Sequence, residues 1–143
     1  MTRINLLNPR ELYDQHLMAE YREIFMIPAA LKRSLKSKRG FKPEDIPPEF
    51  MLGRGHVKFF YDKGKYLDER YEALKKELKR RGYKLDARRI FPRNIFLQHN
   101  LFGAWSPSDK DLALIRERLA QKIAKKPLWY RKTRERTKIY KKI

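Results

Sequence analysis

The chain of 143 residues contains no cysteine and only three histidines. Without cysteine there can be no disulfide, no thiolate zinc ligand and no thiol nucleophile. Three histidines also argue against a metal site built from imidazoles alone. We therefore expect the protein to work without a metal ion or another cofactor.

Long hydrophobic runs are missing as well. No stretch approaches the run of about 18 apolar residues that a membrane-spanning helix needs. The first residues, MTRINLLNPR, lack the basic and then apolar pattern of a signal peptide. These absences predict a cytoplasmic protein. No heptad seam or apolar stripe suggests self-association, so we also expect a monomer.

Acidic residues are scarce. The chain has 36 Lys and Arg but only 17 Asp and Glu, so its formal net charge is +19. The excess is uneven: residues 1–50 carry +2, residues 51–100 carry +8 and residues 101–143 carry +9. Such a field attracts polyanions, of which nucleic acid is the commonest in a cell. The charge favours a nucleic-acid partner over a merely solvated surface, although an anionic membrane surface remains compatible with it.

The first of three predicted helical segments covers residues 9–37. Pro9 suits the first turn of a helix capped by Asn8, whereas Pro28 should kink it, so we expect two half-helices that meet near Pro28. The hydrophobic positions, spaced by three and four, are Leu17, Tyr21, Ile24, Phe25, Leu31 and Leu35.

The second predicted helix covers residues 62–81 and stops at Gly82. Its apolar face is Leu67, Tyr71, Leu74 and Leu78, and its expected outer face is Lys75, Lys76, Lys79, Arg80 and Arg81. The third predicted helix opens with Ser106 and Pro107 and ends at Pro127. Its apolar face is Leu112, Ile115, Leu119 and Ile123.

The segments between these helices are long. HVKFFY at 56–61 is the best strand candidate, and the connections 38–55 and 83–105 are of a length that is usually functional or packed on the core. We expect an all-α, compact single domain over residues 1–143, with about three main helices, long loops and no substantial sheet. Residues 128–143 form a basic aromatic tail, in which Trp129 and Tyr130 could either stack on bases or dock on the core.

One face of the first helix carries His16, Glu20 and Glu23, and a neighbouring stripe carries Gln15 and Arg22. From periodicity alone, we expect such a charged stripe to be the solvated face of a helix that buries its other side. No GxSxG, Walker or HExxH motif is present.

Four blocks of sequence carry a specific resemblance: TRINL at 2–6, DQHLMAEYRE at 14–23, LGRGHVKFFYDK at 52–63 and RLAQKIAKKPLWY at 118–130. In this order and spacing the chain resembles the pyrimidine dimer DNA glycosylases with AP-lyase activity, of the bacteriophage endonuclease V type. The resemblance covers nearly the whole chain and is weakest over residues 24–51 and 83–110.

The resemblance implies an enzyme of UV-damage repair that excises cyclobutane pyrimidine dimers from duplex DNA and then cleaves the strand. Its nucleophile would be the α-amine of Thr2, exposed by removal of Met1, which forms a Schiff base at C1′ before β-elimination. Glu23 would assist the sugar opening and the proton transfers. Contacts to DNA or the lesion would come from Arg3, Gln15, His16, Arg22, Arg118, Lys122, Trp129 and Tyr130. The implied partners are duplex DNA with dimers or abasic sites and, through its phosphates, undamaged DNA.

The chain departs from the family pattern where a further arginine follows the catalytic glutamate. Here the stretch reads IFMIP, with Met26 and no basic side chain before Lys32. Lesion contacts are therefore expected to differ. Two alternatives stay open at this point: a noncatalytic DNA- or RNA-binding module, for which the charge suffices, and a glycosylase directed to other base lesions.

Overall fold

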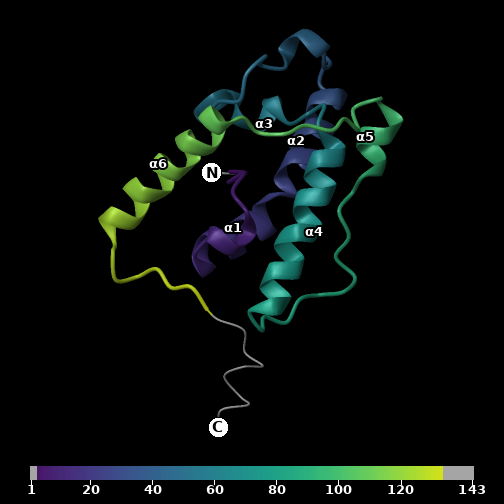
Figure 1. The fold of residues 1–143 in the computed structure, drawn as a ribbon. Coiled ribbons are helices and arrows are strands. Elements are labelled where there is room, and N and C mark those ends of the chain that lie inside the picture. Colours follow the sequence, from purple (N-terminus) through teal and green to yellow (C-terminus); the bar gives the residue numbers. More distant parts are fainter. Residues whose placement is uncertain (1–2, 134–143) are drawn as a thin grey trace.

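The computed structural model describes residues 3–133, and helices form its framework (Figure 1). The α-helices are α1 (Asp14–Glu23), α2 (Met26–Lys36), α3 (His56–Phe59), α4 (Gly64–Arg80), α5 (Asn94–Gln98) and α6 (Asp109–Lys125). Short 3-10 turns cover Pro9–Glu11, Pro43–Asp45 and Gly53–Gly55. Within residues 3–133 no strand forms, and Lys63 and Phe102 make an isolated bridge. The expected all-α fold is confirmed.

The centre of the core lies where α4 packs on α1. The predicted apolar face of α4, Leu67, Tyr71, Leu74 and Leu78, is completely buried. The facing side of α1 buries Leu17 and Tyr21, and the rings of Tyr21 and Tyr71 stack with centroids 5.3 Å apart. Each fully buried side chain of this size stabilises the fold by about 1.5–3 kcal/mol. The helical period in the sequence therefore identified these buried faces correctly.

The predicted break in the first helical segment occurs, but before Pro28 rather than at it. Helix α1 ends at Glu23 and α2 begins at Met26, which places Pro28 in the first turn of α2. A first-turn residue has no intrahelical acceptor for its N–H, so proline fits there without loss. At the end of α1 the Arg89 guanidinium donates to the carbonyls of Tyr21 (2.8 Å) and Arg22 (3.0 Å).

The strand prediction for residues 56–61 is wrong, since His56–Phe59 forms α3. His56, Phe59 and Phe60 are all buried, and this spacing of three and four is that of a helix. The 3-10 turn Gly53–Gly55 leads directly into α3. A run of six residues is too short to show which period governs it.

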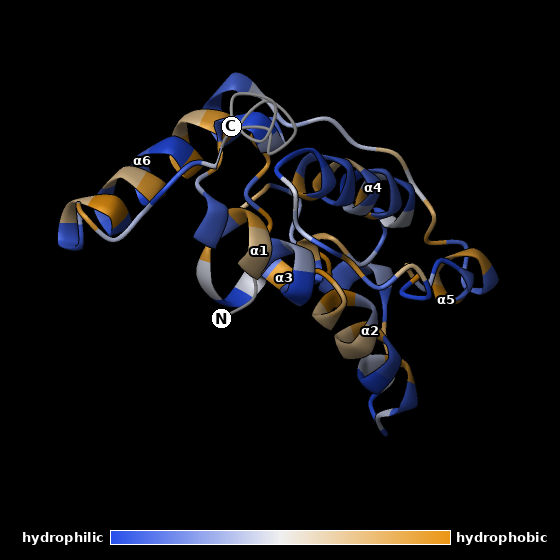
Figure 2. Cartoon of the chain, turned by 90° about the horizontal axis from the view of Figure 1, so that it is seen from below, coloured by the Kyte–Doolittle hydropathy of each residue, from blue (hydrophilic) through white to orange (hydrophobic). Residues whose placement is uncertain are grey.

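Helix α6 begins two residues later than predicted. Ser108, not Ser106, is its N-cap: the Ser108 hydroxyl accepts from the Asp111 N–H, and the Asp111 carboxylate accepts from the Ser108 N–H. Ile115 and Leu119 are buried, while Leu112 and Ile123 are half-buried. Figure 2 shows hydrophobic and hydrophilic residues alternating along α6, as expected of a helix with one covered face.

The long connection 83–105 is packed on the core. Phe91 and Phe96 are buried, and Trp105 lies edge-on to Phe59, Phe60 and Tyr66. The short helix α5 forms inside this connection. No helix in the described part of the chain is both long and apolar enough to cross a membrane.

The placement of Arg81 on the outer face of α4 is wrong. Its side chain is completely buried, and its guanidinium donates to Asp14 (Nη1–Oδ1 2.8 Å) and Glu77 (Nε–Oε2 2.8 Å). Arg81 is the C-cap residue of α4, and Gly82 follows with a φ of +95°, a conformation that glycine adopts without strain. The chain turns there, and Arg81 points inward to α1 because it lies three residues after Leu78 and seven after Leu74, on the buried face of the helix.

This ion-pair network generates a stability prediction. Arg81→Met should lower the free energy of unfolding by about 3 kcal/mol or more, because it leaves Asp14 and Glu77 buried without their shared cation. Lys79 is an exposed cation at the same end of α4, so Lys79→Met should change the free energy of unfolding by less than about 0.5 kcal/mol. Urea unfolding of both variants tests this, and equal stabilities would contradict it.

Candidate functional site

The described chain begins between α1 and α6, where residues 3–7 are held by buried polar side chains (Figure 1). The Ile4 N–H donates to His56 Nε2 (2.8 Å), and the Asn5 N–H donates to Glu20 Oε1 (3.1 Å). Arg70 Nη1 donates to the Leu7 carbonyl at 2.5 Å. Side chains from α1, α3 and α4 thus hold the backbone of this N-terminal segment at residues 4, 5 and 7.

Glu20 and Arg70 also bind each other. Arg70 donates to both oxygens of Glu20 (Nε–Oε2 2.7 Å and Nη2–Oε1 3.0 Å), and both side chains are buried. Burial alone would lower the pKa of Arg70, yet the Glu20 carboxylate raises it above its ordinary value. The solvated-face interpretation of this stripe is therefore wrong for Glu20, because the N-terminal segment and α4 cover that part of α1.

A cluster of charges forms where the N-terminal segment, α1 and α6 meet. Burial lowers the pKa of Arg3, the charge of Arg118 lowers it further, and Glu23 opposes both. Burial also lowers the pKa of Lys122, with Arg3 and Arg118 acting in the same direction and Glu23 against them. We call Arg3, Glu23, Arg118 and Lys122 the basic cluster. The structure brings these four predicted site residues together.

A cleft of about 370 Å³ opens beside the basic cluster. Its lining residues are Arg3, Leu52, Gly53, Leu114, Glu117, Arg118 and Gln121. The cleft therefore combines the start of the chain, the turn before α3 and one face of α6. Within residues 3–133 no group of three or more carboxylate or imidazole side chains is arranged to hold a metal ion.

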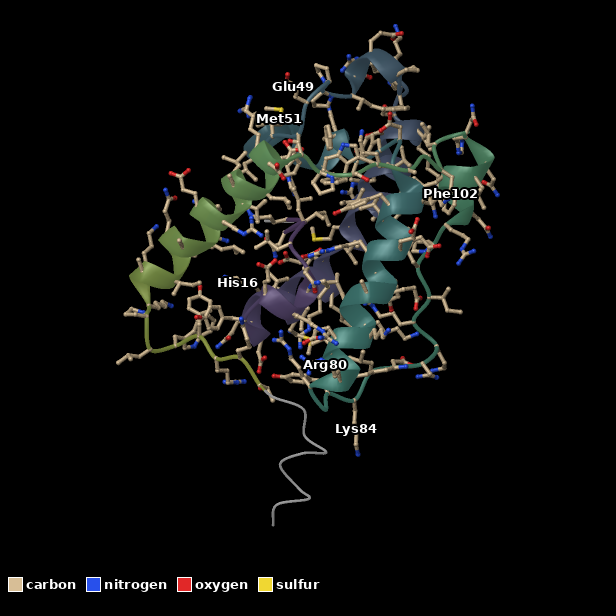
Figure 3. The ribbon with its side chains drawn as sticks, in the orientation of Figure 1. His16, Glu49, Met51, Arg80, Lys84 and Phe102 are labelled. Atoms are coloured by element: carbon tan, nitrogen blue, oxygen red, sulfur yellow. The ribbon has the colours of Figure 1, made fainter. Side chains whose placement is uncertain are left out.

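His16 lies on the α6 side of α1 (Figure 3). Its ring stacks on Tyr130 with centroids 4.7 Å apart, and both ring nitrogens are buried without a hydrogen bond from the described residues. Burial, together with the nearby charge of Lys122, lowers the pKa of His16 to about 4. His16 is therefore a neutral imidazole at physiological pH.

After α6 the chain returns across the start of α1. Gln15 Nε2 donates to the Trp129 carbonyl (2.6 Å), and Gln15 Oε1 accepts from the Arg131 N–H (3.2 Å). Asp14 accepts from the Thr133 N–H (3.0 Å) and, through its other oxygen, from the Thr133 hydroxyl. Gln15 therefore holds the returning chain in this structure, together with Asp14.

Asp14 is the principal anchor of this returning segment. It also accepts from Arg81 (2.8 Å) and from the Tyr83 hydroxyl (2.8 Å). Burial would raise the pKa of Asp14, but hydrogen bonds from Thr133, Tyr83 and Arg81 together hold it below the ordinary value. Asp14 thus connects Arg81, at the end of α4, to the chain that follows α6.

The two tail aromatics behave differently. Tyr130 docks on His16 and Tyr13, whereas Trp129 is 56% exposed and meets Tyr130 edge-on. Trp129 and the exposed Arg22 line a second cleft of about 370 Å³, with Asp14, Gln15, Met18, Ala19, Tyr83 and Arg131. Arg22, Gln15 and Trp129 therefore meet there rather than at the basic cluster.

Thr2 and residues 134–143 of the tail lie outside the described residues. The functional residues that periodicity missed are His56, Glu20 and Arg70, which hold the N-terminal segment, and Asp14, which holds the returning chain. His56 stands inside the block LGRGHVKFFYDK, and Asp14 opens the block DQHLMAEYRE, so the resemblance had marked both regions without assigning these two residues a role.

A helical protein with cations gathered around one carboxylate, and with an exposed aromatic ring at a second cleft, has the features of a protein that acts on nucleic acid. The model of the pyrimidine dimer DNA glycosylase family matches residues 1–91. The chain belongs to that family, and it is accordingly a DNA repair enzyme whose substrate is DNA. The match includes Arg3, Gln15, His16 and Glu23, whereas α6 and the tail lie beyond it.

The environment of His16 generates a pH prediction. Its carbon-bound ring protons should titrate in NMR with a midpoint near pH 4 rather than near 6.5. Because the unfolded chain then binds the proton more tightly, His16 lowers the free energy of unfolding as the pH falls from about 6.5 toward 4. Lys122→Met should raise the midpoint, and an unshifted midpoint near 6.5 in the native protein would contradict this account.

Proposed function

We propose that the protein excises pyrimidine dimers with its N-terminal amine as nucleophile and then cleaves the DNA strand as an AP lyase. The observation that carries this proposal is the basic cluster, which lies at the start of the chain and includes the carboxylate of Glu23. The amine would belong to Thr2 after removal of Met1.

A terminal amine suits this role. Its ordinary pKa is about 7.8, against about 10.4 for lysine, so at pH 7 several hundred times more of it is the neutral nucleophile. Arg3, Arg118 and Lys122 nearby would disfavour its ammonium form further, since like charges oppose protonation. The charges that bind DNA phosphates would thereby also activate the nucleophile.

The proposed reaction begins when the amine lone pair forms a bond to C1′ and the bond from C1′ to the pyrimidine nitrogen breaks. Ring opening of the sugar then gives a protonated Schiff base. This cation makes the C2′ proton acidic; when a base removes it, the bond from C3′ to the phosphate oxygen breaks and the strand on the 3′ side leaves. Water finally hydrolyses the Schiff base and restores the amine.

Glu23 is the group that we assign to the proton transfers of sugar opening and elimination. It is half-buried on α1, beside Arg3 and Lys122. A positioned general base typically contributes about 10²–10⁴-fold to the rate. Within the basic cluster Glu23 is the only carboxylate, so the role falls to this residue.

The remaining residues provide DNA contacts in this proposal. Arg118 and Lys122 would bind phosphates along α6, and Arg22 and Trp129 would bind DNA at the second cleft. His16 is neutral, stacks on Tyr130 and is buried at both ring nitrogens, so it would contact the lesion by packing rather than by hydrogen bonds, with Gln15 beside it. A dimer weakens stacking, so a protein that bends the duplex pays less there than in intact DNA.

The residue at the start of α2 bears on the lesion range. Met26, in the stretch where the family pattern has an arginine, is 49% exposed at the start of α2. A duplex panel with one thymine dimer, one abasic site or one oxidised base distinguishes a dimer enzyme from one directed to other lesions. We expect cleavage of the first two duplexes.

Glu23→Gln tests the catalytic assignment. We expect it to lower cleavage of a dimer-containing duplex at least 100-fold while changing the dissociation constant less than threefold, because it removes a base and keeps the side-chain shape. The matched control is Glu117→Gln, since Glu117 lines the cleft beside the basic cluster. This control should cleave at the native rate. Native-like cleavage by Glu23→Gln would contradict the assignment.

A further inference from the structure

His56 makes two hydrogen bonds that fix its protonation state. Nδ1 lies 3.0 Å from the Met51 carbonyl oxygen, which can only accept, so Nδ1 carries the proton. Nε2 lies 2.8 Å from the Ile4 nitrogen, which can only donate, so Nε2 is the unprotonated acceptor. The ring is thus a neutral imidazole in one defined tautomer.

The surroundings of His56 hold this ring rigidly. Its side chain is 2% exposed, and the rings of Phe50 and Phe60 lie edge-on to it, each with its centroid 5.4 Å away. Burial lowers the pKa of His56, the Met51 carbonyl and Glu20 oppose this effect, and the charge of Arg3 adds to it. Both ring nitrogens are thus hydrogen-bonded, as buried polar groups require, and the ring has one fixed orientation.

We propose that His56 is a positioning residue for the reaction: it holds the backbone at Ile4 so that the N-terminal amine is presented to Glu23. This inference rests on the proposed function, because it presupposes that the amine is the nucleophile. His56 itself touches neither DNA nor the reacting atoms.

The position of this contact along the chain supports the inference. Of the three side chains that hold the N-terminal segment, His56 holds the residue nearest the terminus, whereas Glu20 and Arg70 hold Asn5 and Leu7. The amine nitrogen of Thr2 is two residues from the Ile4 nitrogen, a reach of at most about 7 Å. A misplacement of about 1 Å at a reacting group can cost about 100-fold in rate.

Two substitutions separate the two hydrogen bonds. In His56→Gln the amide oxygen reaches the place of Nε2 and keeps the acceptor for Ile4, while the donor to Met51 is lost. In His56→Asn the amide nitrogen takes the place of Nδ1 and keeps that donor, while the acceptor for Ile4 is lost. A merely structural role would make both variants similarly defective.

The experiment measures borohydride trapping on an abasic duplex in single turnover, together with the dissociation constant of the same duplex and the thermal midpoint. We expect His56→Asn to trap at least tenfold more slowly, with the dissociation constant within threefold of native. His56→Gln should trap within threefold of the native rate. Equal rates for His56→Asn and the native protein, or equal losses in both variants, would overturn the inference.

A second measurement tests the hydrogen bond between Ile4 and His56 independently of enzyme activity. Amide hydrogen exchange at Ile4 should be faster in His56→Asn than in the native protein and nearly unchanged in His56→Gln. If the native protein traps no DNA at all, the proposed function fails and the catalytic part of this inference fails with it. If trapping is normal but Ile4 exchange is the same in all three proteins, the inference alone is overturned.

Discussion

The buried ion pair between Glu20 and Arg70 is the interaction on which the arrangement of the site depends. It joins the middle of α1 to the middle of α4, and the same two side chains bind the backbone of residues 5 and 7. Removing one partner of such a pair costs about 3–5 kcal/mol, because the other charge stays buried. The fold therefore uses a buried ion pair to hold the start of the described chain.

Electrostatics connect this anchor to function. The N-terminal segment brings Arg3 to Arg118 and Lys122, where burial and like charges lower the pKa of both Arg3 and Lys122. Gathering cations in this way opposes folding and favours an anionic ligand, a conflict that is expected at functional sites. Membership in the pyrimidine dimer DNA glycosylase family agrees with DNA as that ligand.

The sequence predicted the helical framework well where one period extends over several turns. Leu67, Tyr71, Leu74 and Leu78 fall on the buried face of α4 as expected. The strand prediction for residues 56–61 was wrong, because a run of six residues is compatible with both the strand period and the helix period. The prediction for Arg81 was wrong for a different reason: Arg81 continues the spacing of three and four from Leu74 and Leu78, so the period places it on the buried face, and only its charge suggested the outer one.

The site was predictable only in part. Resemblance singled out Arg3, Glu23, Arg118 and Lys122, and the structure brings them together, whereas periodicity alone assigned the stripe on α1 to solvent. Periodicity shows which residues share a face but not what covers that face, so the burial of Glu20 by α4 and the N-terminal segment escaped it. The roles of His56 and Asp14 depend on partners 52 and 119 residues away in the sequence.

The central claim is that the amine of Thr2 is the nucleophile, and covalent trapping followed by peptide mapping tests it most directly. The protein without Met1 is incubated with a duplex carrying one thymine dimer, reduced with borohydride, digested and analysed by mass spectrometry beside an undamaged duplex. The account predicts an adduct confined to the damaged duplex and to the peptide that begins at Thr2. An adduct on an internal lysine, or none on the damaged duplex, would contradict it.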